Sequence, residues 1–295
     1  ALRGSASGLQ KARVPLRHGA NGNAASTQGR TALLIAAAHD DSEEIVKLLM
    51  KNGADPKAVD GRQNNALHLA ALADNFAVFK LMLDQGIDVN AQNRPRGMTP
   101  LMAAAGLNNL EAVRLLLARG ANVNVATPES MDGRVKNGTI ALGRMSTLMF
   151  AVPHGKPEMI KTLLGAGADP RAIDVRGMTP LMYAVASEHQ NPEVVRLLLT
   201  AGSDTSVTSV LGETALDWAS KFGHPATLRL FPANAAKSET PVVVQHISAN
   251  VQTGAGDVKK AAETSVSLLQ KTNASFFVNG GCLSCHHADM ANFAY

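Results

Sequence analysis

A phrase that recurs at a nearly constant spacing constrains the fold of this chain more than any other feature. Gly-Met-Thr-Pro-Leu-Met occupies residues 97–102 and again residues 177–182, and shorter versions occur elsewhere. The anchoring leucines of the copies are Leu33, Leu67, Leu101, Leu148, Leu181 and Leu216. The steps between these leucines are 34, 34, 47, 33 and 35 residues. Self-similarity at this period is typical of stacked units that each bury too little surface to fold alone.

Each anchor is followed by a second apolar phrase and then by a turn. Val-Arg-Leu-Leu-Leu occupies residues 113–117 and 195–199, and Gly-Ala-Asp occupies residues 53–55 and 167–169. Proline is tolerated in the first turn of a helix, and glycine ends a helix in the left-handed conformation. These phrases resemble the ankyrin repeat, whose period is about 33 residues and whose opening is Thr-Pro-Leu-His-x-Ala. The resemblance implies a mainly α fold, an ankyrin-repeat solenoid of about six to seven helix-turn-helix repeats over residues 1–231.

Three segments depart from the regular pattern. Residues 1–26 are a degenerate first repeat in which Val14-Pro15 lies where a second helix is expected, so this unit is either a frayed cap or an unreliable stretch of sequence. The step of 47 predicts an insertion within residues 126–143, whose Asn-Gly pair favours a hairpin-like finger. This insertion either takes part in binding or is a surface loop that the fold tolerates, and the sequence favours neither interpretation. Residues 211–231 are predicted to form a C-terminal cap that Trp218 closes.

Composition and charge exclude several classes of function. The net charge of +4 is spread along the chain, without a Lys/Arg block of the kind that binds nucleic acid. The longest apolar runs fall far short of the ~20 residues that cross a bilayer. We find no catalytic triad, phosphate-binding loop or dinucleotide-binding pattern, so we expect no enzyme activity. The histidines of the array, such as His68, are expected to hydrogen-bond the turn of the next repeat, and the array is expected to bind protein partners.

The only two cysteines of the chain lie close together near its C-terminal end. They are Cys282 and Cys285, and with His286 they have the C-x-x-C-H spacing of a c-type haem attachment site. Together with the preceding pair Phe276-Phe277, this order resembles the start of small bacterial c-type cytochrome domains. The resemblance implies that both thiols attach haem c and that His286 is the axial iron ligand. It also implies that Phe276 and Phe277 cover one edge of the haem.

The remaining ligands and the extent of this segment stay open. Residues 232–256 are expected to form a linker, and residues 257–295 a short haem-binding C-terminal segment. This segment ends soon after the motif, so we expect it to be truncated or to be completed by a partner. His287 is a candidate ligand for a second haem, and His246 is a low-ranking candidate for the sixth ligand of the first. The main rival is a zinc site built from the same two cysteines and a histidine.

These features lead to one main functional hypothesis and one alternative. The main hypothesis is an electron-transfer c-type cytochrome on an ankyrin scaffold, with a redox partner or self-assembly completing or stacking its haem. Covalent haem implies a periplasmic or extracellular location, because in bacteria the attachment machinery lies outside the cytoplasmic membrane. The alternative is a protein-binding ankyrin scaffold whose haem or zinc element is structural and has no redox role. A peroxidase with an open distal position ranks third.

Overall fold

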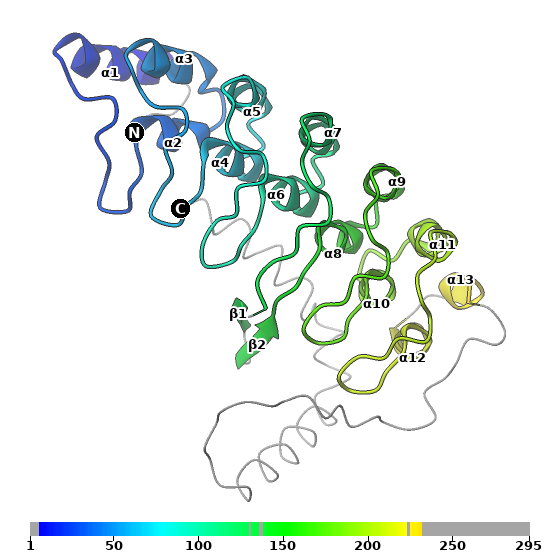
Figure 1. Cartoon of the computed structure of the whole chain (residues 1–295). Helices are drawn as coiled ribbons and strands as arrows, with labels where there is room; N and C mark the ends of the chain where they lie inside the picture. The colour runs from blue at the N-terminus through cyan, green and yellow to red at the C-terminus, as the bar shows by residue number, and fades with distance from the viewer. Residues whose placement is uncertain (1–5, 130, 136–137, 223–224, 232–295) are drawn as a thin grey trace, which may run out of the picture.

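The computed structural model describes residues 6–129, 131–135, 138–222 and 225–231. Helices come in pairs that stack in two layers (Figure 1). The first helices of the pairs are α2 (Ala32–Ala37), α4 (Ala66–Leu72), α6 (Pro100–Gly106), α8 (Thr147–Ala151), α10 (Pro180–Ala186) and α12 (Ala215–Phe222). The second helices are α3 (Glu43–Lys51), α5 (Phe76–Leu83), α7 (Leu110–Ala118), α9 (Pro157–Gly165), α11 (Pro192–Thr200) and α13 (Pro225–Leu228). A short 3-10 helix, η1 (Val152–His154), follows α8.

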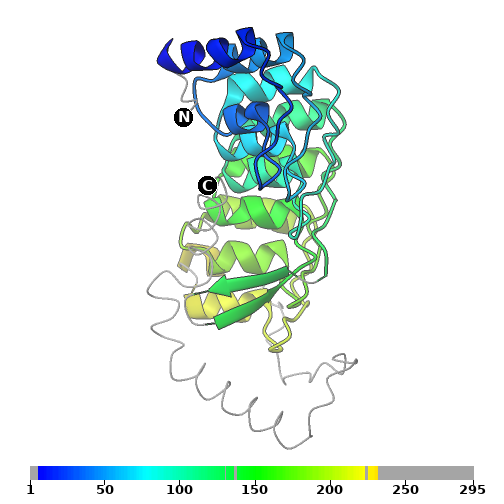
Figure 2. The same cartoon turned by 90° about the vertical axis from the view of Figure 1, so that its left-hand side faces the viewer.

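Each layer is continuous because every helix packs against its equivalent in the next repeat. In the first-helix layer α6 contacts α4 and α8, and in the second-helix layer α5 contacts α3 and α7. We call the loop that precedes each first helix a finger loop. Turned by 90°, the array shows these loops gathered along one edge of the helix stack (Figure 2). The predicted mainly helical repeat solenoid is therefore confirmed.

The recurring Thr-Pro-Leu phrase forms the start of a first helix. The Oγ1 atom of Thr99 accepts a hydrogen bond from the N–H of Met102 at 3.2 Å, and Pro100 follows Thr99 as the first helical residue. Capping of this kind stabilises a helix by about 1 kcal/mol. Leu101 and Leu181, the anchors of two copies, are 0% exposed. The phrase thus caps the helix and at the same time fills the core between repeats.

Asparagine side chains join the turns of neighbouring repeats. Asn124 donates from Nδ2 to the carbonyl of Gly167 at 2.8 Å, and its Oδ1 accepts from the N–H of Asp169 at 2.9 Å. Asn23 and Asn90 make the same pair of bonds to the turn of the repeat after theirs. We call Asn23, Asn90 and Asn124 the asparagine ladder. It links the repeats outside their apolar core.

A β-hairpin interrupts the finger loop before α8. Strands β1 (Met131–Val135) and β2 (Gly138–Leu142) are antiparallel, with Met131 opposite Leu142. The N–H of Thr127 donates to the carbonyl of Met145 at 3.0 Å at the base of the hairpin. Strands β1 and β2 lie within the range 126–143, to which the repeat spacing assigns an insertion, and they project on the finger side (Figure 1).

The first described helix of the array lies in the layer of second helices. Helix α1 (Ala6–Arg17) packs against α3 and contains Pro15. This helix lies within residues 1–26, which are expected to form a degenerate first repeat, and it runs through the proline. Pro15 lies in the last turn, where the carbonyl of Lys11 is the one acceptor that loses its partner, so the helix tolerates it.

At the other end, Trp218 on α12 packs against the core and lies beside Phe222, with 5.7 Å between ring centroids. None of the described helices is long and apolar enough to cross a membrane. The predicted linker, 232–256, and the predicted haem segment, 257–295, lie outside the described residues.

Candidate binding surface

The side chains predicted to hold haem lie outside the described part of the chain. They are His246, Phe276, Phe277, Cys282, Cys285, His286 and His287. Their roles, and haem c itself, stay predictions. Within the described ranges, no group of three or more His, Cys, Asp or Glu side chains is placed to hold a metal ion. The candidate site is a surface that the finger loops supply.

Buried carboxylates hold two of the finger loops in shape. Asp60 is 3% exposed, and its Oδ1 accepts from the N–H groups of Arg62 and Asn64, both at 2.9 Å. Asp174 is 2% exposed, and its Oδ1 accepts from the N–H of Arg176 at 2.8 Å. A buried acceptor that binds loop N–H groups fixes the backbone, because leaving it unpaired would be costly. The exposed side chains of these loops are thereby set in place.

The finger loop before α6 has an amide where the other two have a carboxylate. Asn93 accepts from the N–H of Met98 at 2.9 Å, and its Nδ2 donates to Oδ1 of Asn64 at 2.8 Å. The N–H of Arg94 donates to the carbonyl of Arg62 at 2.6 Å. These bonds tie the loop to its neighbour, so Arg62 and Arg94 come from different repeats but lie on adjoining backbone.

The replacement of a carboxylate by Asn93 leaves this part of the surface basic. Asp60 forms an ion pair with Arg30 at 3.7 Å, and Asp174 pairs with Arg176 at 2.9 Å. Arg62 and Arg94 are exposed, and neither forms an ion pair within the described part of the chain. The two carboxylates are thus engaged by Arg30 and Arg176, and they leave the charges of Arg62 and Arg94 without an ion pair among the described residues.

His68 forms the floor beneath these arginines. It is 0% exposed, and its Nε2 lies 2.9 Å from the carbonyl oxygen of Met98, to which it donates. Its Nδ1 accepts from the N–H of Asn65 at 3.4 Å. Burial lowers the pKa of His68 to about 4, so the ring is neutral at pH 7. The predicted hydrogen bond from a histidine to the next repeat's turn is confirmed here.

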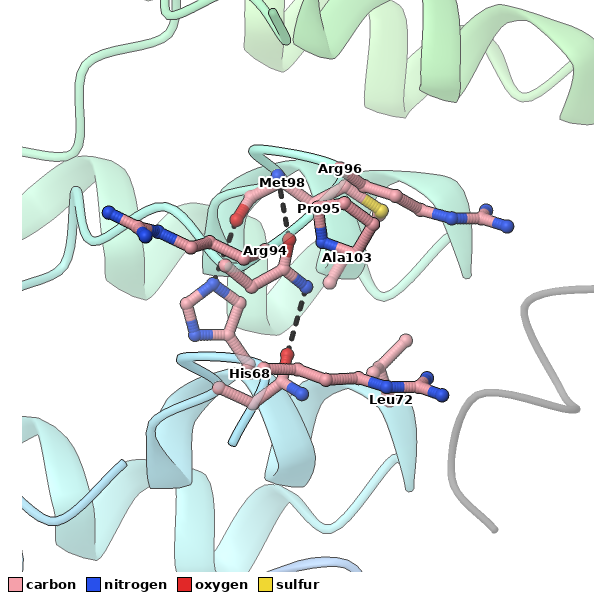
Figure 3. A pocket seen from close by; sticks show the side chains of 10 residues that line it. His68, Leu72, Arg94, Pro95, Arg96, Met98 and Ala103 are labelled. Atoms are coloured by element: carbon pink, nitrogen blue, oxygen red, sulfur yellow. Dashed lines mark hydrogen bonds between the residues drawn. The ribbon is translucent and has the colours of Figure 1, made fainter. Parts of the chain in front are cut away.

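A cavity opens between these groups (Figure 3). Arg62, Arg94 and Arg96 line it from two finger loops, and Leu72 and Ala103 line it from α4 and α6. Arg94 and Arg96 extend to opposite sides of it in Figure 3. We call these three arginines with Leu72 and Ala103 the basic cavity. It combines fixed positive charge with an apolar wall, which suits a ligand that has both acidic and apolar groups.

Sequence reasoning missed the basic cavity. The available signal was the arginines that precede the anchor phrase, Arg62 in one repeat and Arg94 and Arg96 in the next. Counted along the chain, they are part of a mild excess of positive charge. They become a site only when neighbouring finger loops lie side by side.

A family model described as ankyrin repeats in three copies matches residues 34–127 and 148–240, which is more than half of the chain. The chain belongs to the ankyrin-repeat family. Its first helices, second helices and finger loops are those of ankyrin repeats, and ankyrin repeats mediate protein–protein interaction.

Named relatives share the ankyrin-repeat part. The chain is 30% identical over 156 residues to the transient receptor potential channel pyrexia of Drosophila melanogaster, covering 53% of this chain and 15% of that protein. It is 30% identical over 158 residues to the nuclear factor NF-kappa-B p105 subunit of Gallus gallus, covering 52% of this chain and 15% of that protein. Among solved structures, the ankyrin repeat domain of Bcl-3 superposes with a TM-score of 0.56 at 25% identity, covering 76% of this chain and 91% of that one. The chain thus spans about a seventh of these two curated relatives.

The hypothesis of an electron-transfer cytochrome is wrong. The matched family is the ankyrin repeat, and none of the relatives named above is a cytochrome. The alternative, a protein-binding ankyrin scaffold, agrees better with these matches. The C-x-x-C-H spacing specifies at most the attachment of a haem, whereas electron transfer also needs a second axial ligand and a formed pocket.

Proposed function

We propose that this chain is a protein-binding scaffold, without enzyme activity of its own, whose finger loops and first helices form the binding surface. The observation that supports this most is the basic cavity, where exposed side chains stand on loops that buried hydrogen bonds hold in place. Loops fixed before binding lose little conformational freedom when a partner docks, which favours affinity. One ankyrin-repeat relative is named as a subunit, that is, as part of an assembly.

Variants on opposite faces of the array test this function. Arg94→Glu and Ile173→Glu change exposed residues of two different finger loops, whereas Arg114→Glu changes an exposed residue of the second helix α7. A partner that the full chain captures saturably should be lost with at least one finger-loop variant and retained by Arg114→Glu, at unchanged thermal stability. Loss with Arg114→Glu alone would move the binding surface to the second helices. The absence of any saturable partner would contradict the scaffold function.

A separate proposal concerns the C-terminal motif. We propose that Cys282 and Cys285 hold a structural haem c or zinc ion that has no redox role. Covalent haem would in addition indicate a periplasmic or extracellular protein. A pyridine-haemochrome spectrum, the intact mass and zinc analysis of the purified chain distinguish the two groups, and a chain with neither would rule out the proposal. Cys282→Ala is expected to leave partner binding by the array unchanged.

A further inference from the structure

We propose that the basic cavity binds an acidic peptide segment of a partner protein, in which carboxylates flank an apolar side chain. This inference rests on the proposed scaffold function and specifies the chemistry of the partner. Its starting point is the side chains that line the cavity, Arg62, Arg94 and Arg96 from the finger loops and Leu72 and Ala103 from the first helices.

The charge of the cavity selects an anionic ligand. Among the described residues that line it, none is acidic, and the floor residue His68 is neutral at pH 7. Asp60, in the same finger loop as Arg62, is buried and engaged by Arg30, by Asn64 and by loop N–H groups. A carboxylate brought to this place therefore meets Arg62 and Arg94, which form no ion pair within the described part of the chain. Arginine suits this role because its planar guanidinium presents a fork of donors to a carboxylate.

The apolar wall of the cavity favours a peptide over a nucleic acid. The partly exposed Leu72 offers an apolar contact beside the arginines, which an aliphatic side chain of a peptide matches and a phosphate backbone does not. Arg62 and Arg94 would attract either class of ligand, so the apolar contact and the proposed scaffold function are what favour the peptide.

The arrangement of the arginines indicates how such a segment lies. Arg94 and Arg96 extend to opposite sides of the cavity in Figure 3, with Pro95 between them. A peptide that places an apolar side chain against Leu72 can therefore present an acidic residue to an arginine on each side. The bonds from Arg94 to Arg62 and from Asn93 to Asn64 hold the two loops at a fixed spacing, so the arginines are positioned before the ligand arrives.

Fluorescence anisotropy with a labelled peptide, a leucine flanked on both sides by glutamates, tests the inference on the full chain. Saturable binding is expected that weakens with added salt. Arg62→Glu and Arg94→Glu should each weaken it about ten- to a hundredfold. Arg94→Lys, which keeps the charge but loses the fork, should weaken it several-fold. Arg114→Glu makes the same charge change on the second helix α7 and should leave the affinity unchanged.

Several results would overturn the inference. One is that a peptide with glutamine in place of glutamate binds as tightly as the acidic peptide. Another is that the Arg62 and Arg94 variants still bind the acidic peptide. A third is that no saturable binding occurs at about millimolar peptide. Tighter binding of a labelled single-stranded oligonucleotide than of the peptide, lost in the same variants, would assign the cavity to nucleic acid instead. If the acidic peptide does not bind but Ile173→Glu still abolishes capture of a partner, the acidic-peptide inference is wrong and the scaffold function stands. If no finger-loop variant weakens the binding of any partner, the proposed binding surface of the scaffold is wrong as well.

Discussion

Removing one member of the asparagine ladder should weaken the stacking of neighbouring repeats. Asn124→Ala deletes two hydrogen bonds, one to the carbonyl of Gly167 and one from the N–H of Asp169. A net contribution of about 0.5–1.5 kcal/mol for each bond gives a loss of about 1–3 kcal/mol in the free energy of unfolding. Because both bonds are exposed, water replaces part of what is lost. We therefore expect the lower end, about 1 kcal/mol.

The chain also offers the reverse experiment. Lys57 occupies the ladder position between Asn23 and Asn90, four residues after the turn glycine Gly53. Lys57→Asn should supply the missing bonds to the turn that begins at Gly86 and raise the free energy of unfolding by about 1 kcal/mol. Loss at one position and gain at another, from the same side chain, would assign the effect to the ladder and not to general surface change.

Urea unfolding followed by far-UV circular dichroism measures both effects. The midpoint should fall for Asn124→Ala and rise for Lys57→Asn, at an unchanged dependence on urea concentration. Arg114→Ala on α7, outside the ladder, is the control and should leave the midpoint unchanged. A change below about 0.5 kcal/mol for Asn124→Ala, the size of an ordinary surface substitution, would refute a stabilising ladder.

Three further predictions concern the core and the loops. Gly155 has a φ of +60°, and a Cβ added there would lie 2.2 Å from the carbonyl oxygen of His189. Gly155→Ala should therefore lower the free energy of unfolding by more than about 2 kcal/mol. Gly165→Ala, in the open last turn of α9, should instead stabilise it by about 0.5 kcal/mol, and both effects are read from urea midpoints. Leu101 is 0% exposed, so Leu101→Ala should lower the free energy of unfolding by about 2–5 kcal/mol, and a loss below about 1 kcal/mol would contradict its role as a core anchor. His68, with its pKa lowered to about 4 by burial, binds a proton in the unfolded chain before it does so in the folded one. The contribution of His68 to the free energy of unfolding should therefore be full above pH ~6.5 and fall by about 3 kcal/mol as the pH drops to ~4. In His68→Gln the free energy of unfolding should fall less steeply over this pH range. An equally steep fall in both proteins would contradict this prediction.

The solenoid could be predicted from the sequence because its signals are local. Leu101 and Leu181 repeat with their capping threonines and following prolines, and each copy independently predicts a capped helix with a buried anchor. Pro15 shows the limit of such reasoning. A proline interrupts a helix interior, but its effect depends on how many turns follow it, and α1 ends two residues later at Arg17.

The basic cavity could not be predicted in this way. Arg62 and Arg94 belong to different repeats, and their meeting depends on how the finger loops stack. The cavity also depends on Asn93 standing where Asp60 and Asp174 stand in other loops. That exchange removes a charge that would otherwise compensate an arginine, and its significance appears only when the loops are compared in space.

Hydrogen–deuterium exchange of the full chain, with and without the acidic leucine peptide, tests most directly whether the finger loops form the binding surface. We predict that saturating peptide slows exchange in the finger loops around Arg62 and Arg94 and leaves the second helices α5 and α7 unchanged. Protection confined to α5 and α7, or no protection at saturation, would contradict a scaffold that binds its partners through the basic cavity.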